Sequence, residues 1–303
     1  GLPEELEKVA GPGDVFLVKK PRPLDAHKGD FGRLLVIGGS EVFSGAPALV
    51  ALAALRTGID IVYLAAPAKT AYAVSSMSPN LITVKLKGDQ LNVENKKELL
   101  PYLKMVDAVV LGPGIGLHDK TLEFVKEFIP AIENMGKPLL LDADGMKAFA
   151  RFKRALKVPL VLTPHAGEYA LLAGRKPPED VGERVVEVQK TAAELNAVVL
   201  LKGQVDIICD AKRVKQNVTG NPGMTVGGTG DVLAGIVGAF LAQKADAFEA
   251  AVAGAFVNGA AGDFAAIEIG YHLMATDLIN WIPKVLDDPT SHLQVQKHGG
   301  ANA

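Results

Sequence analysis

The sequence predicts an α/β fold in which a central, mostly parallel β-sheet is covered by helices on both faces. Short runs rich in Val, Ile and Leu recur along the chain without polar alternation, as is typical of strands buried on both faces of a parallel sheet. Helical patterns separate these runs, so strand and helix alternate. The chain after residue 228 reads almost entirely as helix, which is enough to cover one face of the sheet.

The elements follow in order along the chain. The apolar runs predict strands at residues 33–39, 59–64, 108–111, 138–141, 159–162 and 197–201. Helical patterns between them place helices at residues 45–57, 119–134, 165–173 and 178–195. Two further β-type segments, 205–209 and 213–216, flank a short turn and predict a hairpin that adds antiparallel strands at one end of the sheet. Three closing helices are expected at residues 228–243, 247–269 and 276–286.

Residues 24–288 are expected to form a single domain, because no linker or internal repeat interrupts the pattern between residues 30 and 288. Residues 1–23 carry four prolines and are expected to form an extended lead-in. Residues 289–303 are polar and lack periodicity, which predicts a disordered or added tail. The chain begins at Gly1 rather than Met, as expected of a processed chain or of a fragment of a longer protein.

Composition argues against several classes of function. The formal net charge of −2 and the pI of about 6.4 indicate no partner surface for nucleic acid or for an anionic membrane. The single cysteine, Cys209, lies in an apolar run and is expected to be a buried, inert thiol in a cytoplasmic protein. The apolar segment 250–270 contains Asn258, Asp263 and Glu268, so it reads as a buried helix rather than a membrane span.

Ligands of open parallel sheets bind beyond the carboxyl ends of the strands, and this chain places unusual residues there. Glycines end one predicted strand, at Gly38-Gly39, and follow another, at Gly112-Pro113-Gly114-Ile115-Gly116, where the backbone can approach a ligand or simply turn. Asp142 and Asp144 follow the next strand. They can position a metal or a ligand hydroxyl, although Asp144 can equally be only the cap of the next helix.

Two later strand ends add a histidine and a lysine. Thr163 can cap the next helix, with Pro164 in its first turn. That explanation leaves His165 unexplained, and we interpret it as a donor to substrate in preference to a surface histidine. Lys202 and Gly203 follow residues 197–201 and suit a phosphate group, with a plain surface lysine as the alternative.

The strongest single signal is the turn Gly227-Gly228-Thr229-Gly230-Asp231, which opens an apolar helix. Successive amides at a helix N-terminus bind anions, and Asp231 beside them can accept a hydroxyl proton while the amides stabilise a transferring phosphoryl group. The alternative interpretation makes Asp231 only a charge that complements the helix dipole. The turn is not a Walker A loop, because it lacks the Gly-Lys-Ser/Thr ending.

Gly-Thr-Gly-Asp at the start of a late helix resembles the anion-hole signature of ribokinase-like folds, which implies a three-layer αβα sandwich. Residues 27–285 resemble a narrower family, the ADP- or ATP-dependent NAD(P)H-hydrate dehydratases. The resemblance is carried by six motifs in one order: Lys28-Gly29-Asp30-Phe31-Gly32, Ser44-Gly45-Ala46-Pro47, Gly112-Pro113-Gly114-Ile115-Gly116, Asp142-Ala143-Asp144-Gly145, Thr163-Pro164-His165-Ala166-Gly167-Glu168 and Asn221-Pro222-Gly223-Met224.

The resemblance implies a nicotinamide repair reaction. The substrate would be hydrated NADH or NADPH, whose ring hydroxyl is phosphorylated by ADP or ATP with Mg²⁺ and then eliminated with help from the ring nitrogen. Asp231 would be the catalytic base, and no metal ligand is assigned. The hydrated dinucleotide would contact Ala46, Gly114, Gly116, His165 and Asp231. The adenine nucleotide would contact Lys202, Gly203, Gln204, Val205, Asp206, Gly228, Thr229 and Gly230.

Two positions depart from the family's pattern. Asp206 stands where the family often has Thr or Ser, and Asn258 stands where a histidine is expected, so the roles of both positions are open. Two short stretches, residues 1–5 and 11–14, resemble the junction after the epimerase domain of fused epimerase–dehydratase proteins. The resemblance also implies a homotetramer.

Two other functions compete with the dehydratase. A small-molecule alcohol kinase of the same fold would use the same glycine turn and Asp231 but would leave a phosphorylated product. A non-catalytic nucleotide-binding module would bind adenine nucleotide without turnover. The motifs at residues 44–47 and 163–165 favour the dehydratase.

Overall fold

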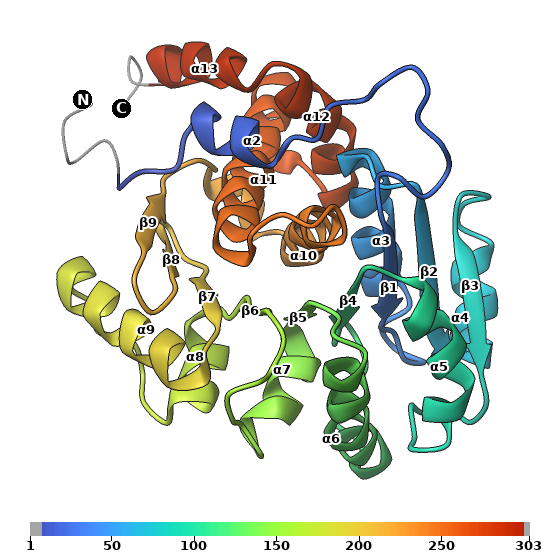
Figure 1. The fold of residues 1–303 in the computed structure, drawn as a ribbon. Helices are drawn as coiled ribbons and strands as arrows, with labels where there is room; N and C mark the ends of the chain where they lie inside the picture. The colour runs from blue at the N-terminus through green and yellow to red at the C-terminus, as the bar shows by residue number, and fades with distance from the viewer. Residues whose placement is uncertain (1–7, 300–303) are drawn as a thin grey trace.

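One nine-stranded sheet organises the computed structural model, which describes residues 8–299, with side chains as far as residue 295 (Figure 1). The strand order is β3-β2-β1-β4-β5-β6-β7-β8-β9. Pairs from β3 to β7 are parallel, whereas β7, β8 and β9 pair antiparallel. The strands are β1 Arg33–Ile37, β2 Ile61–Pro67, β3 Ile82–Leu86, β4 Ala108–Leu111, β5 Leu139–Leu141, β6 Leu160–Leu162, β7 Val198–Leu201, β8 Asp206–Cys209 and β9 Val214–Asn217.

The predicted parallel sheet and the added hairpin are confirmed. Every residue of β4, β5, β6 and β7 is buried, because helices cover both faces of the sheet there. The first face carries α3 Gly45–Thr57, α10 Thr229–Ala242, α11 Ala247–Ile269 and α12 Ala275–Asp287. The second face carries α5 Asn95–Met105, α6 Asp119–Asn134, α7 Ala143–Ala150, α8 Ala166–Ala173 and α9 Val181–Leu195. The fold is therefore the expected three-layer αβα sandwich.

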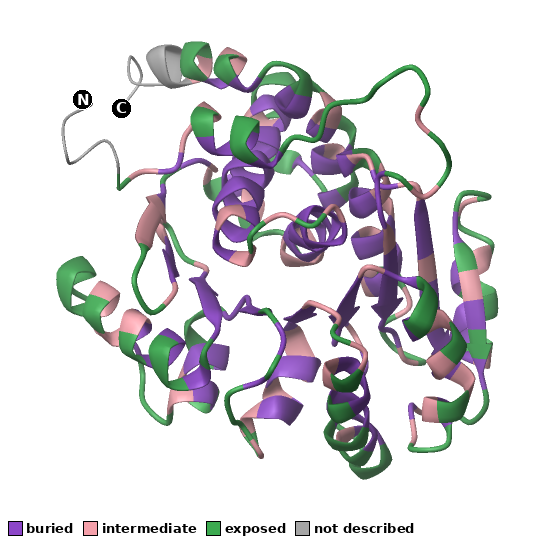
Figure 2. Ribbon diagram, in the orientation of Figure 1, coloured by how far each residue is buried: buried purple, intermediate pink, exposed green. Residues whose placement is uncertain are grey.

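Small residues bring the helices of the first face close together. A methyl group at Gly235 of α10 would lie 2.2 Å from the carbonyl oxygen of Val50 in α3, so only glycine permits this approach. The helix from Ala247 to His272 is apolar enough to cross a membrane, but 83% of its most apolar window is buried in the fold. Figure 2 shows this interior position of α10 and α11. The prediction of a buried helix at residues 250–270 is confirmed as far as residue 266, and the last four residues of that range are exposed.

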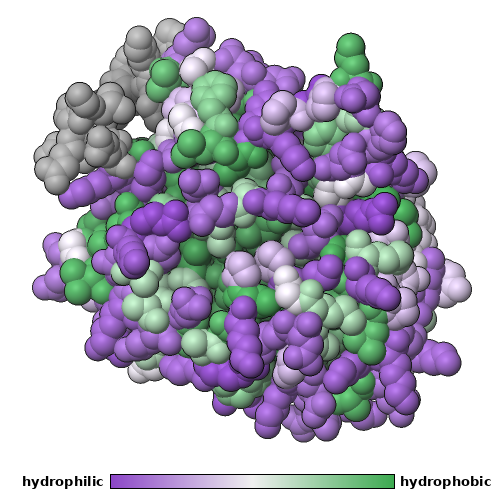
Figure 3. All heavy atoms as spheres, viewed as in Figure 1, coloured by the Kyte–Doolittle hydropathy of each residue, from purple (hydrophilic) through white to green (hydrophobic). Residues whose placement is uncertain are grey.

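Hydrophilic side chains predominate on the face seen in Figure 3.

The described part of the chain also contains elements that the sequence patterns did not indicate. These are β3, α4 Ala68–Ser75, α5 and α7.

Two predictions about the ends of the chain are wrong. The lead-in contains a helix, α2 Pro12–Val18, in which Pro12 occupies the first turn and the Asp14 carboxylate accepts from the Gly11 N–H at 2.8 Å. The tail contains a 3-10 turn, Pro289–Ser291, and a helix, α13 His292–Gly299. The first residue of α13, His292, is only 1% exposed. Contacts of this buried side chain therefore stabilise a helix that the sequence pattern did not indicate. The proposed epimerase junction at residues 1–5 lies outside the described residues.

Candidate active site

The motifs from distant parts of the sequence meet at one edge of the sheet. Strands β1, β4, β5, β6 and β7 are neighbours in the sheet and run parallel, so the residues that follow their carboxyl ends lie side by side. The N-terminus of α10 lies at the same edge, because Lys202 after β7 approaches Gly230. The topology therefore assembles the crevice that the strand-end motifs predicted.

A cavity of about 690 Å³ opens on the β7 side of this edge. Its lining includes every residue predicted to bind the nucleotide except Gly228. It also includes a segment that the sequence reasoning did not assign to the site, residues 218–222 with Met224 and Thr225, and three residues of α11, Ala255, Asn258 and Gly259. The motif Asn221-Pro222-Gly223-Met224 was a usable signal for this segment, because it precedes the glycine turn.

Lys202 is placed between an acidic cluster and the start of α10. Its ammonium lies 3.5 Å from the Asp142 Oδ1, and a methyl group at Gly230 would lie 3.1 Å from its Nζ. Burial acts to lower the pKa of Lys202, but the carboxylates of Asp142, Glu168 and Asp231 outweigh it and raise that pKa. The side chain is therefore a fixed cation at the helix N-terminus, as a phosphate site requires.

The first turn of α10 offers unpaired amides to an anion. Gly228 is the N-cap and has a φ of +98°, which favours glycine, and no side chain in the described part of the chain caps the helix. The Gly228 Cα is also confined, since a methyl group there would lie 2.7 Å from Leu49 and 2.9 Å from Ala275. The amides at the start of this 14-residue helix are thus held rigidly and lack an internal acceptor.

Asp231 stands in that first turn, and its carboxylate has a strongly raised pKa. Burial, reinforced by the nearby Asp142 and Glu168 carboxylates, raises the pKa of Asp231 to about 7, although Lys202 acts to lower it. A carboxylate with that pKa is half ionised at pH 7 and can take a proton from a hydroxyl more readily than an ordinary aspartate. A residue that only complemented the helix dipole would not need a raised pKa, so these surroundings favour the interpretation of Asp231 as a base over that alternative.

The other end of the crevice is formed by the glycine loop after β4 and the start of α3. A methyl group at Gly114 would lie 3.3 Å from the Ala46 Cβ, so these two predicted substrate residues are neighbours. The Gly116 N–H donates to the Asp144 carboxylate at 3.0 Å. Asp144 therefore secures the glycine loop instead of capping α7, whose N-cap residue is Asp142.

The interpretation of Thr163 as a helix cap is wrong. The N-cap of α8 is His165, whose Nδ1 accepts from the amides of Gly167 and Glu168 at 3.0 and 3.2 Å. Because Nδ1 is an acceptor, the proton of the neutral ring belongs on Nε2, and the ring is 59% exposed. Thr163 instead donates to the Asp142 Oδ1 at 2.9 Å and holds that carboxylate beside Lys202.

The two departures from the family pattern have different surroundings. The Asp206 carboxylate accepts from the Gly203 N–H at 3.1 Å and from the Asn217 side chain at 3.0 Å, so it braces the turn that lines the cavity. Burial raises the pKa of Asp206, although these two hydrogen bonds and Lys202 oppose the shift. Asn258 donates weakly to the Thr229 carbonyl at 3.4 Å, and its Oδ1 has no partner among the described residues.

A divalent cation fits this donor set only together with a ligand. Within the described residues, no three His, Cys, Asp or Glu side chains form a metal cluster. Mg²⁺, however, commonly takes one or two carboxylates and completes its shell with water and substrate phosphates. Asp142, Glu168 and Asp231 all act electrostatically on Lys202 and supply such oxygens. The residues present therefore suit Mg²⁺ that arrives with nucleotide phosphates.

Comparisons with known proteins show which family the chain resembles along most of its length. The chain is 46% identical over 286 residues to a bifunctional NAD(P)H-hydrate repair enzyme of Pyrobaculum aerophilum, covering 94% of this chain and 56% of the relative. It is 36% identical over 280 residues to an ADP-dependent (S)-NAD(P)H-hydrate dehydratase of Cenarchaeum symbiosum, covering 92% of this chain and 96% of that one. The chain thus spans about half the length of the bifunctional relatives it matches.

The structural comparison confirms the predicted ribokinase-like fold. A ribokinase-like superfamily protein of Enterococcus faecalis superimposes with a TM-score of 0.80 at 25% identity, covering 92% of this chain and 95% of the other. The family model described as NAD(P)H-hydrate dehydratase matches residues 34–284, most of the chain. The chain belongs to the NAD(P)H-hydrate dehydratase family.

Proposed function

We propose that this chain repairs hydrated NADH and NADPH by a dehydration that consumes ADP, with ATP as the alternative co-substrate. The observation that carries the proposal is Asp231, a carboxylate with a pKa raised to about 7 in the first turn of an uncapped helix. A base and an anion site are thereby joined in one turn. The ADP-dependent relative supports ADP as the co-substrate.

In the first step, Asp231 takes the proton of the ring hydroxyl. The hydroxyl oxygen forms a bond to the terminal phosphorus of ADP, and the anhydride bond to AMP breaks. The amides of the α10 first turn and the ammonium of Lys202 stabilise the charge on the transferring group. These groups are in place before the ligand arrives, so little reorganisation is needed.

In the second step, the new phosphate ester leaves as inorganic phosphate. The ring nitrogen supplies the electron pair that expels it, and the adjacent ring carbon then loses a proton to restore the dihydronicotinamide. A phosphate leaves far more readily than hydroxide, which is why a nucleotide is consumed.

The two ligands occupy different parts of the crevice. The AMP portion of ADP fits the cavity of about 690 Å³ beside Lys202, a volume within the usual range for a ligand of this size. The hydrated ring extends from Asp231 toward the exposed ring of His165, whose Nε2 lies 3.4 Å from the Glu168 Oε1, and toward Ala46 and the glycine loop. Magnesium, held by phosphate oxygens and by Asp142, would neutralise charge on the nucleotide.

The direct test incubates the protein with hydrated NADH and either ADP or ATP. We expect the absorbance of reduced nicotinamide to recover, with one inorganic phosphate released per molecule repaired. Asp231→Asn is the matched control, because it keeps the shape of the side chain but removes the base. A phosphorylated product that accumulates without phosphate release would instead identify an alcohol kinase, and binding without turnover would identify a nucleotide-binding module.

The single cysteine supports a cytoplasmic location, and the family resemblance supports a homotetramer. We propose a cytoplasmic homotetramer, and light scattering of the purified chain tests the assembly.

A further inference from the structure

The segment from Val218 to Thr225, here the nucleotide loop, forms one wall of the cavity and joins β9 to α10. Only Pro222–Thr225 has regular structure, as a single 3-10 turn. Its shape therefore depends on what it contacts rather than on its own backbone ladder. All of its residues except Gly223 line the cavity, so the position of the loop determines whether the nucleotide site exists.

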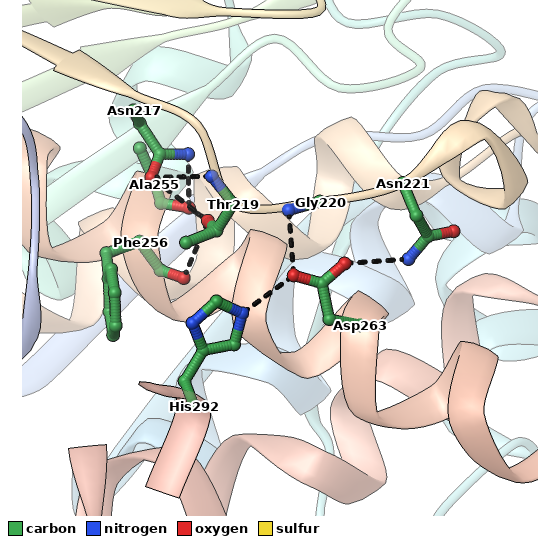
Figure 4. A network of polar contacts seen from close by, with 8 residues as sticks. All are labelled: Asn217, Thr219, Gly220, Asn221, Ala255, Phe256, Asp263 and His292. Carbon is green, nitrogen blue, oxygen red and sulfur yellow. Dashed lines mark hydrogen bonds and ion pairs between the residues drawn. The ribbon is translucent and has the colours of Figure 1, made fainter. Parts of the chain in front are cut away.

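The loop is fixed to α11 by a polar network (Figure 4). The Asp263 carboxylate accepts from the Gly220 N–H at 3.1 Å and from the Asn221 side chain at 3.0 Å. The Thr219 hydroxyl donates to the Phe256 carbonyl at 3.1 Å. These bonds attach consecutive loop residues to one face of the helix.

Two glycines of α11 make this close approach possible. A methyl group at Gly259 would lie 2.0 Å from the Thr219 Oγ1, and one at Gly262 would lie 2.2 Å from the Met224 Sδ. The surfaces of the loop and of α11 are therefore complementary, and a larger side chain at either glycine would separate them.

The network joins three parts of the chain: the nucleotide loop, α11 and the C-terminal segment. His292, the first residue of α13, has its Nε2 2.7 Å from the Asp263 Oδ2, the same oxygen that accepts from Gly220. Its ring packs edge-on against Phe256 and Phe264, with centroids 5.5 and 6.2 Å apart. Because a carboxylate only accepts, the His292 proton belongs on Nε2, and the buried Nδ1 has no partner among the described residues.

We propose that His292 and Asp263 are positioning residues for the adenine nucleotide: the C-terminal segment clamps Asp263, and Asp263 holds the nucleotide loop in the form that binds ADP. This inference rests on the proposed use of a nucleotide. Neither side chain lines the cavity, so both act through Gly220 and Asn221. Without the His292 donor, the mostly buried carboxylate would turn toward water and release the loop.

Loss of the His292–Asp263 contact would lower the fraction of molecules whose nucleotide loop can bind ADP. If loss of the clamp leaves the loop in its binding form about a tenth of the time, the apparent affinity for ADP falls about tenfold. The affinity for hydrated NADH would stay unchanged, because its contacts lie on the far side of Asp231.

The experiment compares three variants of the full chain by titration calorimetry with ADP and by amide hydrogen exchange at Gly220. His292→Ala removes the donor. His292→Gln restores an N–H near the Nε2 position. Trp281→Leu is the matched control, because Trp281 stacks on Phe264 at 5.5 Å and its loss loosens the same packing without touching Asp263.

We expect His292→Ala to weaken ADP binding about tenfold and to speed exchange at Gly220, and His292→Gln to recover most of both. Trp281→Leu should lower the melting temperature alone. Unchanged ADP affinity in a folded His292→Ala, or an equal loss in Trp281→Leu, would overturn the proposal. If hydrated NADH is not repaired but ADP binds, the dehydratase proposal fails while the clamp is still decided by the titration. If the unaltered chain does not bind ADP, both fail.

Discussion

Ionisation of Asp231 should make the folded protein less stable at neutral and higher pH. Its pKa is raised from an ordinary 3.8 to about 7 by burial and by the Asp142 and Glu168 carboxylates. Between these two values the native chain binds a proton that the unfolded chain has lost, so stability falls as pH rises and levels off above pH 7. A shift of about three units corresponds to about 4 kcal/mol.

The substitution Asp231→Asn removes that cost, because the amide is neutral at every pH. Lys202 keeps Asp142 as a partner in the variant. At pH 8 we expect the free energy of unfolding to rise by up to about 4 kcal/mol, and the gain to shrink by about 1.4 kcal/mol per pH unit below pH 7. The repair rate should fall by about 10² to 10⁴, the usual contribution of a general base.

Urea unfolding at pH 8 and at pH 5 measures the effect, provided that the dependence of the unfolding free energy on urea concentration is the same for both proteins. The reasoning is refuted if Asp231→Asn is no more stable than the unaltered chain at pH 8, or if the difference does not depend on pH. The same pKa predicts that kcat/KM of the unaltered chain falls about tenfold for each pH unit below 7.

Other substitutions test the rest of the site. Lys202→Met should raise the KM for ADP and shift the pH profile of the rate to higher pH, since the Lys202 cation lowers the pKa of Asp231. Gly259→Ala should weaken ADP binding, whereas Gly254→Ala, which also clashes within the core, should lower only the melting temperature. Asp144→Ala should raise the KM for hydrated NADH alone, and Asp144→Asn should restore it. Cys209, buried and with its pKa raised to about 12, should resist alkylation in the native protein.

Strands were predictable where both faces are buried, because burial leaves an uninterrupted apolar run. The edge strand β3 lacks that signal, since its central Val84 is buried while Ile82 and Lys85 are exposed. Helix α5 offers only a narrow apolar stripe, since its only buried residues are Asn95, Leu99 and Leu103, and α4 buries only Thr70, Ala71 and Val74. These elements owe their structure to contacts with the sheet more than to their own sequence.

The residues of the site also divide into those that the sequence could predict and those that it could not. Residues directly after strands could be foreseen, because a parallel sheet brings its carboxyl ends together. The cap of α8 was misassigned, since histidine is not among the usual capping residues. The α11 wall of the nucleotide cavity and the contribution of His292 could not be foreseen, because they depend on packing between segments that are far apart in the sequence.

The charges of the site explain why a nucleotide should bring a metal with it. Lys202 faces the carboxylates of Asp142, Glu168 and Asp231, so the cluster is already short of positive charge. A diphosphate beside Asp231 would raise the pKa of that base further and hold it protonated, which would stop the reaction it serves. A divalent cation that arrived with the phosphates would cancel this effect, and the Asp231 carboxylate would then accept the hydroxyl proton. In the proposed mechanism, the acidic cluster that raises the pKa of Asp231 would therefore also create the need for a divalent cation such as Mg²⁺.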